Sequence, residues 1–388
     1  MDARQAIRHG IPIYIAALVM RSSMMVMNPL LPVFKAQYHL SAFHVSFLSS
    51  LPILCFAGAG LLMPLVRRIG VTNRIIAAGL IVITFGVSIR MFGSLLLLFF
   101  SVIAVGIGIA ILNFTLPVWI KEEVPENSGL LTSLYVTLMG IFAAVAIATA
   151  VPLSHLTSIG WRLSMVPWLI LGLFSSIWWI KMNRNKVELA AAELTPHFHA
   201  RFFHSLDAWA ITLFFGFQSM LAYGIATWLP SILLSKGYSL NSAGYTVSAT
   251  GLMGSLLGIF VPYLVVKIRK LRTLLVGAGI LMSISFGALI FDHGWHLIIW
   301  LLLGSIGLAV TFQVSLLLTI FRGASAGETR SLSIMSQSIG YLMAMFAPGI
   351  VGATFDATHN WNDALIIPVV LGIVVAVVGS VAGREGTV

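Results

Sequence analysis

The sequence of 388 residues is 59% hydrophobic and only 9% charged, with a mean hydropathy of +1.01. Soluble globular chains carry about 25% charged residues, so this composition excludes an ordinary soluble core and predicts a multi-pass membrane protein. The single cysteine, Cys55, lies in an apolar stretch and excludes a disulfide framework. We expect neither a metal nor a cofactor.

Apolar runs long enough to cross a bilayer recur from end to end of the chain. A spanning helix needs about 20 such residues. The first run is too long for a signal-peptide core, so we expect an uncleaved first span. Spans 3 and 4 meet at a tight turn, 90–93, and spans 4 and 5 at a polar inner loop, 121–129. The pattern predicts twelve spans: 11–34, 46–66, 74–91, 94–119, 129–152, 162–181, 208–233, 243–266, 273–291, 295–320, 331–354 and 362–382.

The Lys and Arg residues indicate the orientation of these spans. With the N-terminus in the cytoplasm, 17 of the 22 fall at inner ends. This excess obeys the positive-inside rule and predicts a bacterial inner-membrane protein with both termini cytoplasmic. A net charge of +10 often indicates nucleic-acid binding. Here topology and anionic inner-leaflet lipid account for it, so we expect a bilayer partner and no nucleic acid.

The chain divides into two similar halves. Pro32 and Pro230, and likewise Gly140 and Gly340, are separated by 198–200 residues, which indicates duplication of a six-span unit. We predict a six-helix bundle at 1–181, a cytoplasmic linker at 182–207 and a second six-helix bundle at 208–388. The linker holds three histidines, which we interpret as incidental because no Cys or carboxylate completes a metal site. Two parallel repeats around a central substrate site are the architecture of the major facilitator superfamily.

Arg21 is the most informative residue of the chain. It lies in the middle of the first span, with no acidic residue anywhere in Ile11–Val33. A charged side chain at that depth costs roughly 2.5–3.5 kcal/mol even on lenient scales, and it is retained where it meets a partner, a ligand or water. All twelve acidic residues lie at span ends, in loops or at the termini. The pattern therefore favours an anion carrier in which the substrate neutralises Arg21. Uniport, exchange and proton co-transport all remain open.

Polar side chains at similar depth could complete the binding site. Ser333, Gln337 and Tyr341 recur every four residues, on one face of span 11. The alternative is that such groups only join helices, at about 0.6 kcal/mol each. Arg90, near the outer end of span 3, is either a vestibule charge that attracts anions or a snorkelling or helix-end arginine. The predicted substrate-binding residues are Arg21, Asn28, Asn113, Gln218, Tyr223, Gln337 and Tyr341.

Several motifs resemble one family. Leu18-Val-Met-Arg21 followed by Pro29-Leu-Leu-Pro32 is similar to the opening signature of the CynX/NimT family, the cyanate and 2-nitroimidazole transporters of the major facilitator superfamily. Further similar segments are 88–90, 116–121, 129–135, 215–230 and 333–341. Val19, Ser22 and Asn28 depart from the signature around Arg21. The resemblance implies a small, often anionic or planar polar solute, and the departures mean that it need not be cyanate.

We therefore predict a twelve-helix, all-α, monomeric secondary transporter that works by alternating access on a small molecule. The alternative within this fold is a multidrug or metabolite efflux carrier in which Arg21 is held structurally by backbone carbonyls. A membrane-embedded enzyme or a sensor is the rival from another class. An enzyme should show paired carboxylates, a histidine cluster or an activated nucleophile, and the sequence shows none of these, so we expect no catalytic residue.

Overall fold

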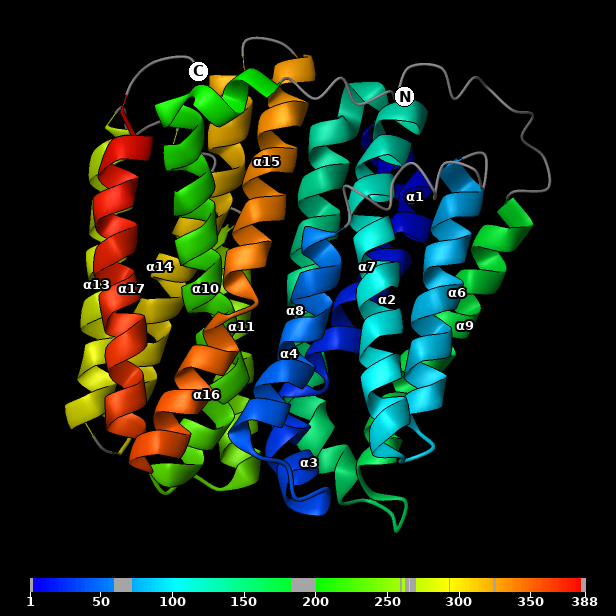
Figure 1. Cartoon of the computed structure of the whole chain (residues 1–388). Coiled ribbons are helices and arrows are strands. Elements are labelled where there is room, and N and C mark those ends of the chain that lie inside the picture. Colours follow the sequence, from blue (N-terminus) through cyan, green and yellow to red (C-terminus); the bar gives the residue numbers. More distant parts are fainter. Residues whose placement is uncertain are drawn as a thin grey trace. The chain divides into compact units, whose positions relative to one another are not determined.

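A computed structural model describes residues 3–58, 72–182, 200–258, 260–261, 265, 270–292, 294–323 and 326–384, and within these ranges the chain is helical, without strands (Figure 1). The contacts divide the chain into two compact units. Unit 1 comprises Met1–Leu31 and Gly58–Leu194, and unit 2 comprises Pro32–Ala57 and Thr195–Val388. Each unit is described by itself.

Unit 1 is built around the pair α6 and α7, with α9 against α6 and with α2 against α8 and α9. The predicted polar loop at 121–129 is largely helical. α7 continues to Glu123, and only Val124 separates it from the next helical turn. The elements are α1 (Ala3–His9), α2 (Ile11–Met25), η1 (Asn28–Leu30), α6 (Thr72–Arg90), α7 (Leu95–Glu123), η3 (Pro125–Asn127), α8 (Ser128–Ser154), η4 (Gly160–Met165) and α9 (Val166–Met182).

Close packing of α6 on α7 depends on a glycine. A Cβ on Gly86 would lie 2.9 Å from the backbone oxygen of Ser101 and 2.8 Å from a methyl carbon of Val105. Real side chains do not tolerate such distances, so only glycine allows this approach, as is common between membrane helices. The crossing brings the last turn of α6, which ends at Arg90, alongside Ser101 of α7.

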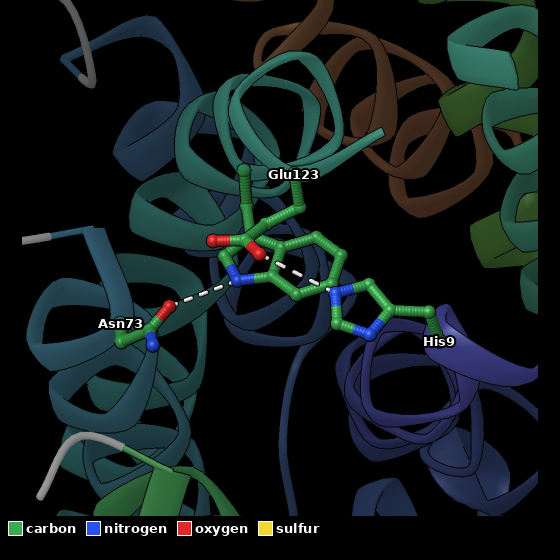
Figure 2. Close-up of polar contacts among 4 residues, drawn as sticks. His9, Asn73 and Glu123 are labelled. Carbon is green, nitrogen blue, oxygen red and sulfur yellow. Dashed lines mark hydrogen bonds and ion pairs between the residues drawn. The ribbon is translucent and has the colours of Figure 1, made fainter. Parts of the chain in front are cut away.

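A cluster of polar and aromatic side chains joins α1, α6 and α7 at one end of unit 1 (Figure 2). Trp119 is buried, and its indole Nε1 donates to Oδ1 of Asn73 over 2.8 Å. The His9 ring stacks on Trp119 with centroids 5.4 Å apart, and its Nε2 lies 3.3 Å from Oε2 of Glu123 (Figure 2). These contacts anchor α1, and with it the start of α2, to the ends of two longer helices.

Unit 2 contains the remaining helices. α10 packs against α15 and α17, α13 against α14 and α17, and α4 against α15 and α16. Its elements are α3 (Leu31–Gln37, with the unit boundary after Leu31), α4 (Ala42–Ala57), η7 (Ala200–His204), α10 (Leu206–Ser235), α11 (Leu240–Gly258), α13 (Leu271–Phe291), α14 (His296–Arg322), α15 (Ala326–Ala344), α16 (Ala347–Thr358) and α17 (Trp361–Ala382).

Ten helical segments in the described ranges are long and apolar enough to cross a membrane, and they correspond to ten of the twelve predicted spans. The other two predicted spans begin in α4 and α11, and much of their remainder lies outside the described residues. Most of the predicted linker, including His197 and His199, also lies outside them. The division at 182–207 stays a prediction. The contact-based units differ from it by grouping α4 with the helices of the second half.

Candidate substrate-binding site

The first span is interrupted just after Arg21. α2 ends at Met25, and the chain then passes through a 3₁₀ turn, Asn28–Leu30, before α3 begins at Leu31. Pro29 has no N–H to donate to the carbonyl four residues back. That carbonyl belongs to Met25. The backbone already tightens two residues before Pro29, where Met27 N donates to Met24 O over 3.4 Å rather than to Ser23 O. The carbonyl of Ser23 is left without its helical donor.

Arg21 lies on the one open face of this span. Its exposed or partly exposed residues follow a single winding stripe, and every other residue of 12–27 is buried. In the part of the chain that the structure describes, Arg21 makes no hydrogen bond and no ion pair. Because an unpaired guanidinium is expensive in hydrocarbon, we interpret this stripe as bordering water. The stripe consists of Ile11, Ile15, Leu18, Arg21, Met24 and Asn28.

The two predicted asparagines of unit 1 share no hydrogen bond among the described residues. Asn28 opens the 3₁₀ turn, is partly exposed, and donates from Nδ2 to the sulfur of Met25 over 3.7 Å. Asn113 of α7 is exposed. At about 100° of rotation per residue, it lies roughly a third of a turn from the apolar stripe of α7 formed by the exposed Leu96 and Phe100 and the partly exposed Ile107. No hydrogen bond between described residues joins Arg21, Asn28 and Asn113.

Arg90 is a helix-end arginine, as one of the sequence-based interpretations expected, but it is neither a vestibule charge nor a snorkelling side chain. It is the last residue of α6, as a helix-end arginine should be, but it is only 1% exposed and therefore neither lines a vestibule nor snorkels. Its Nη1 donates to the free carbonyl of Ser23 over 3.0 Å, and its Nε donates to Ser101 Oγ over 3.1 Å. No carboxylate among the described residues lies within ion-pair distance of it. A buried cation thus replaces the hydrogen bond that the interruption removes.

In unit 2, α10 and α15 cross closely at a pair of glycines. A Cβ on Gly340 would collide with Cδ1 of Phe215 and lie 3.1 Å from the backbone nitrogen of Gly216. The absence of side chains at this crossing brings the next residue of α15, Tyr341, against Phe215.

Tyr341 is the centre of an aromatic cluster drawn from three helices. Its ring centroid lies 5.1 Å from that of Phe215 and 6.3 Å from that of Tyr223, both on α10, and 5.6 Å from that of Phe56 on α4. All three pairs are edge-to-face, the geometry that aromatic quadrupoles favour. The structure therefore brings together the predicted site residues Tyr223 and Tyr341 and adds two phenylalanines.

The two predicted glutamines of unit 2 have unfilled hydrogen-bonding capacity. Gln218 is 1% exposed; its Nε2 donates to Ser219 Oγ over 2.7 Å, and its Oε1 is buried without a partner among the described residues. Leaving such an acceptor unpaired costs about 1–3 kcal/mol, so a donor on a bound solute would stabilise it. Gln337 lies one turn before Tyr341, is partly exposed, and makes no hydrogen bond within the described ranges.

Unit 2 has an interrupted span of its own. α15 ends at Ala344 and α16 begins at Ala347, because Pro348 cannot continue the hydrogen-bonding pattern. Neutral donors meet the carbonyls there. Ser50 Oγ donates to Met345 O over 2.5 Å, and Pro348 O accepts from Ser46 Oγ over 2.8 Å and from Trp228 Nε1 over 2.9 Å.

Comparisons with known proteins place this arrangement in a family. The sequence pattern of the Major Facilitator Superfamily matches residues 13–348. The chain belongs to the major facilitator superfamily. It is 33% identical over 359 residues to the 2-nitroimidazole transporter of Escherichia coli (92% of this chain, 90% of the relative) and 33% identical over 371 residues to the uncharacterized transporter YycB of Bacillus subtilis (95% and 92%). It is 24% identical over 346 residues to the cyanate transport protein CynX of Escherichia coli, with 89% of each chain covered.

Solved structures agree with this assignment. The fold matches that of a bacterial homologue of the human lysosomal transporter Spinster with a TM-score of 0.83 at 14% identity, over 99% of this chain and 98% of that one. The predicted superfamily fold and the CynX/NimT resemblance are thereby confirmed. The protein is a multi-pass membrane transporter of this superfamily and not an enzyme.

Sequence reasoning on this transporter missed the two phenylalanine partners of Tyr341, which are Phe215 and Phe56. Phe215, Ser219 and Tyr223 recur every four residues on α10, a signal that a search restricted to polar groups passes over. Phe56 carries no such signal, because its role depends on α4 packing against α15 of the same unit. The position of each proposed ligand is thus described, and their role in binding stays a prediction.

Proposed function

We propose that this transporter moves a small anionic or planar polar solute, such as a cyanate-like or nitroimidazole-like compound, and that Arg21 is its anion ligand. The observation that carries the proposal is an unpaired guanidinium in mid-span, on the open stripe of the first span and one turn before its interruption. A charge-assisted hydrogen bond from Arg21 to an anion would supply the missing partner.

The relatives support the choice of solute. They are named for a flat nitro-heterocycle and for a small linear anion, and both chemistries suit a guanidinium. Val19, Ser22 and Asn28 depart from the family signature beside Arg21, so the solute of this chain is proposed only as a class.

Unit 2 would contribute neutral contacts. We propose Gln218, Tyr223, Gln337 and Tyr341 as its solute-binding residues. The unpaired Oε1 of Gln218 would accept a hydrogen bond from a donor on the solute. The edge-to-face rings around Tyr341 provide an apolar surface suited to a flat solute.

The proposed setting is the bacterial inner membrane, with both termini in the cytoplasm and the protein acting as a monomer by alternating access. The positive-inside distribution of Lys and Arg supports this orientation. Cysteine labelling from each side of the membrane, at single cysteines placed near residues 4 and 384 of a Cys55→Ser background, would test it.

Thermal shift of the purified transporter tests the solute class. The probes are cyanate, benzoate and 2-nitroimidazole, and the variants are Arg21→Gln and the control Arg272→Gln, which removes an exposed arginine at the start of α13. We expect at least one anion to stabilise the wild type and the control, and to lose its effect in a folded Arg21→Gln.

Two outcomes would contradict the proposal. If only neutral compounds bind, and Arg21→Gln binds them equally well, the protein is the efflux carrier of the alternative interpretation. If Arg21→Gln fails to fold while Arg272→Gln folds normally, Arg21 is structural.

A further inference from the structure

The interruption of the first span requires only a hydrogen-bond donor, and Arg90 brings a positive charge as well. In unit 2, hydroxyl and indole groups, all neutral, satisfy the carbonyls at the interruption of span 11. In unit 1, the carbonyl of Ser23 accepts from a buried guanidinium instead. A neutral donor would complete the same hydrogen bond without placing a charge in the interior.

The charge of Arg90 is not neutralised by its neighbours. Its described contacts are the hydroxyl of Ser101, the carbonyl of Ser23 and the sulfur of Met165, the last at 3.8 Å. These groups solvate a cation but carry no negative charge. A buried ion without a counter-ion is costly, so a bound anion would lower the energy of this region.

The position of Arg90 links it to the proposed anion ligand. Ser23 follows Arg21 by two residues and is the point at which α2 loses its regular hydrogen bonding. By bonding to this carbonyl, Arg90 fixes the end of the helix that carries Arg21, and it adds a second positive charge to the same segment.

We propose that Arg90 is a positioning residue for anion binding, acting through α2 and through its buried charge while Arg21 contacts the solute. This inference rests on the proposed function of Arg21. For an assumed separation of roughly 10 Å and an effective dielectric constant of about 20, one unit charge changes the affinity for an anion by about tenfold or somewhat more. The affinity for a neutral analogue should not change.

The test separates charge from hydrogen bonding. Met165 is fully buried and lies beside the Arg90 guanidinium, so Met165→Glu would place a counter-ion there while Arg90 keeps its bond to Ser23. Met165→Gln is the matched neutral control. Arg90→Gln removes the charge outright, and Arg90→Lys retains it. Isothermal titration with benzoate and with its neutral analogue benzamide measures the ratio of their affinities.

We expect Met165→Glu and Arg90→Gln to weaken benzoate binding about tenfold with benzamide unchanged, and Met165→Gln and Arg90→Lys to stay near the wild type. Equal losses for both probes in Met165→Glu and Met165→Gln, or no loss in Met165→Glu, would overturn the role of Arg90. If Arg90→Gln does not fold, the comparison of Met165→Glu with Met165→Gln still tests the effect of the Arg90 charge. A wild type with no preference for benzoate would instead overturn the proposed function itself.

Discussion

The interrupted spans of the two units solve one physical problem with different chemistry. Near Pro29, the carbonyl left free in α2 accepts from the buried cation Arg90. Near Pro348, the carbonyl of Met345 between α15 and α16 and that of Pro348 in the first turn of α16 accept from two serine hydroxyls and an indole. Both interruptions satisfy backbone groups that hydrocarbon cannot, but only the first introduces charge.

If the proposed function holds, this difference separates two kinds of contribution to transport. Unit 1 holds Arg21 on an open stripe and Arg90 behind it, so its side chains should govern the preference for anions over neutral compounds. Unit 2 holds the aromatic cluster around Tyr341 and the neutral amides, so its side chains should govern stability and the preference for flat rings.

The largest expected effect is at the helix crossing of unit 2. Gly340→Val would drive a side chain into the Phe215 ring and toward the backbone of Gly216, and overpacking of this kind costs about 3 kcal/mol. Thermal denaturation of the detergent-purified protein should show a markedly lower midpoint. Gly251→Val is the control, because a Cβ there meets nothing within 4 Å. Equal midpoints for the two variants would contradict the close crossing.

Trp228→Phe should weaken the neutral interruption without touching charge selectivity. The change removes the donor to Pro348 O and part of a side chain that is 1% exposed. The free energy of unfolding should therefore fall by about 2 kcal/mol. The matched control is Trp295→Phe, where the ring is 66% exposed. A changed ratio of benzoate to benzamide affinity in Trp228→Phe would contradict the assignment of anion preference to unit 1 alone.

Tyr341→Leu tests the aromatic cluster as a ring-binding surface. Loss of edge-to-face contacts should reduce the affinity for benzoate and benzamide alike by about five- to tenfold, or roughly 1 kcal/mol, and leave that for linear cyanate nearly unchanged. Tyr245→Leu, with its side chain 52% exposed, controls for the loss of a tyrosine. If the affinities for cyanate and benzoate fall equally, the cluster stabilises the fold and does not bind the ring of the solute.

The smallest effect is expected at Ser50. Ser50→Ala removes one hydrogen bond to Met345 O, worth about 1 kcal/mol of stability, and should leave both benzoate and benzamide binding intact. Ser255→Ala serves as the control, since that hydroxyl bonds only to a carbonyl of its own helix. A selective loss of benzoate binding in Ser50→Ala would show that unit 2 also contributes to anion preference.

Much of the fold could be predicted from the sequence because hydropathy and span length are local properties. The runs around residues 74–91 and 273–291 became α6 and α13 with ends shifted by at most two residues. The first span was predicted as continuous, and the structure interrupts it at Pro29. That proline was visible, but proline does not always interrupt a membrane helix. Pro230 lies inside an unbroken α10.

The candidate site was only partly predictable, because side-chain direction depends on tertiary packing. The partly exposed position of Arg21 is the one expected for a cation in a span without acids. The burial of Arg90 does not, because it requires Gly86 to let α6 approach α7 and Ser23 to offer a free carbonyl. Phe56 likewise became relevant only through the packing of α4 on α15.

Whether Arg21 binds the anion is decided by calorimetric titration of Arg21→Gln with benzoate and benzamide. The wild type and Arg272→Gln should bind benzoate more tightly than benzamide. In Arg21→Gln, benzoate affinity should fall until the two probes bind about equally. An Arg21→Gln protein that keeps the wild-type preference for benzoate would contradict a role of Arg21 in binding the anion.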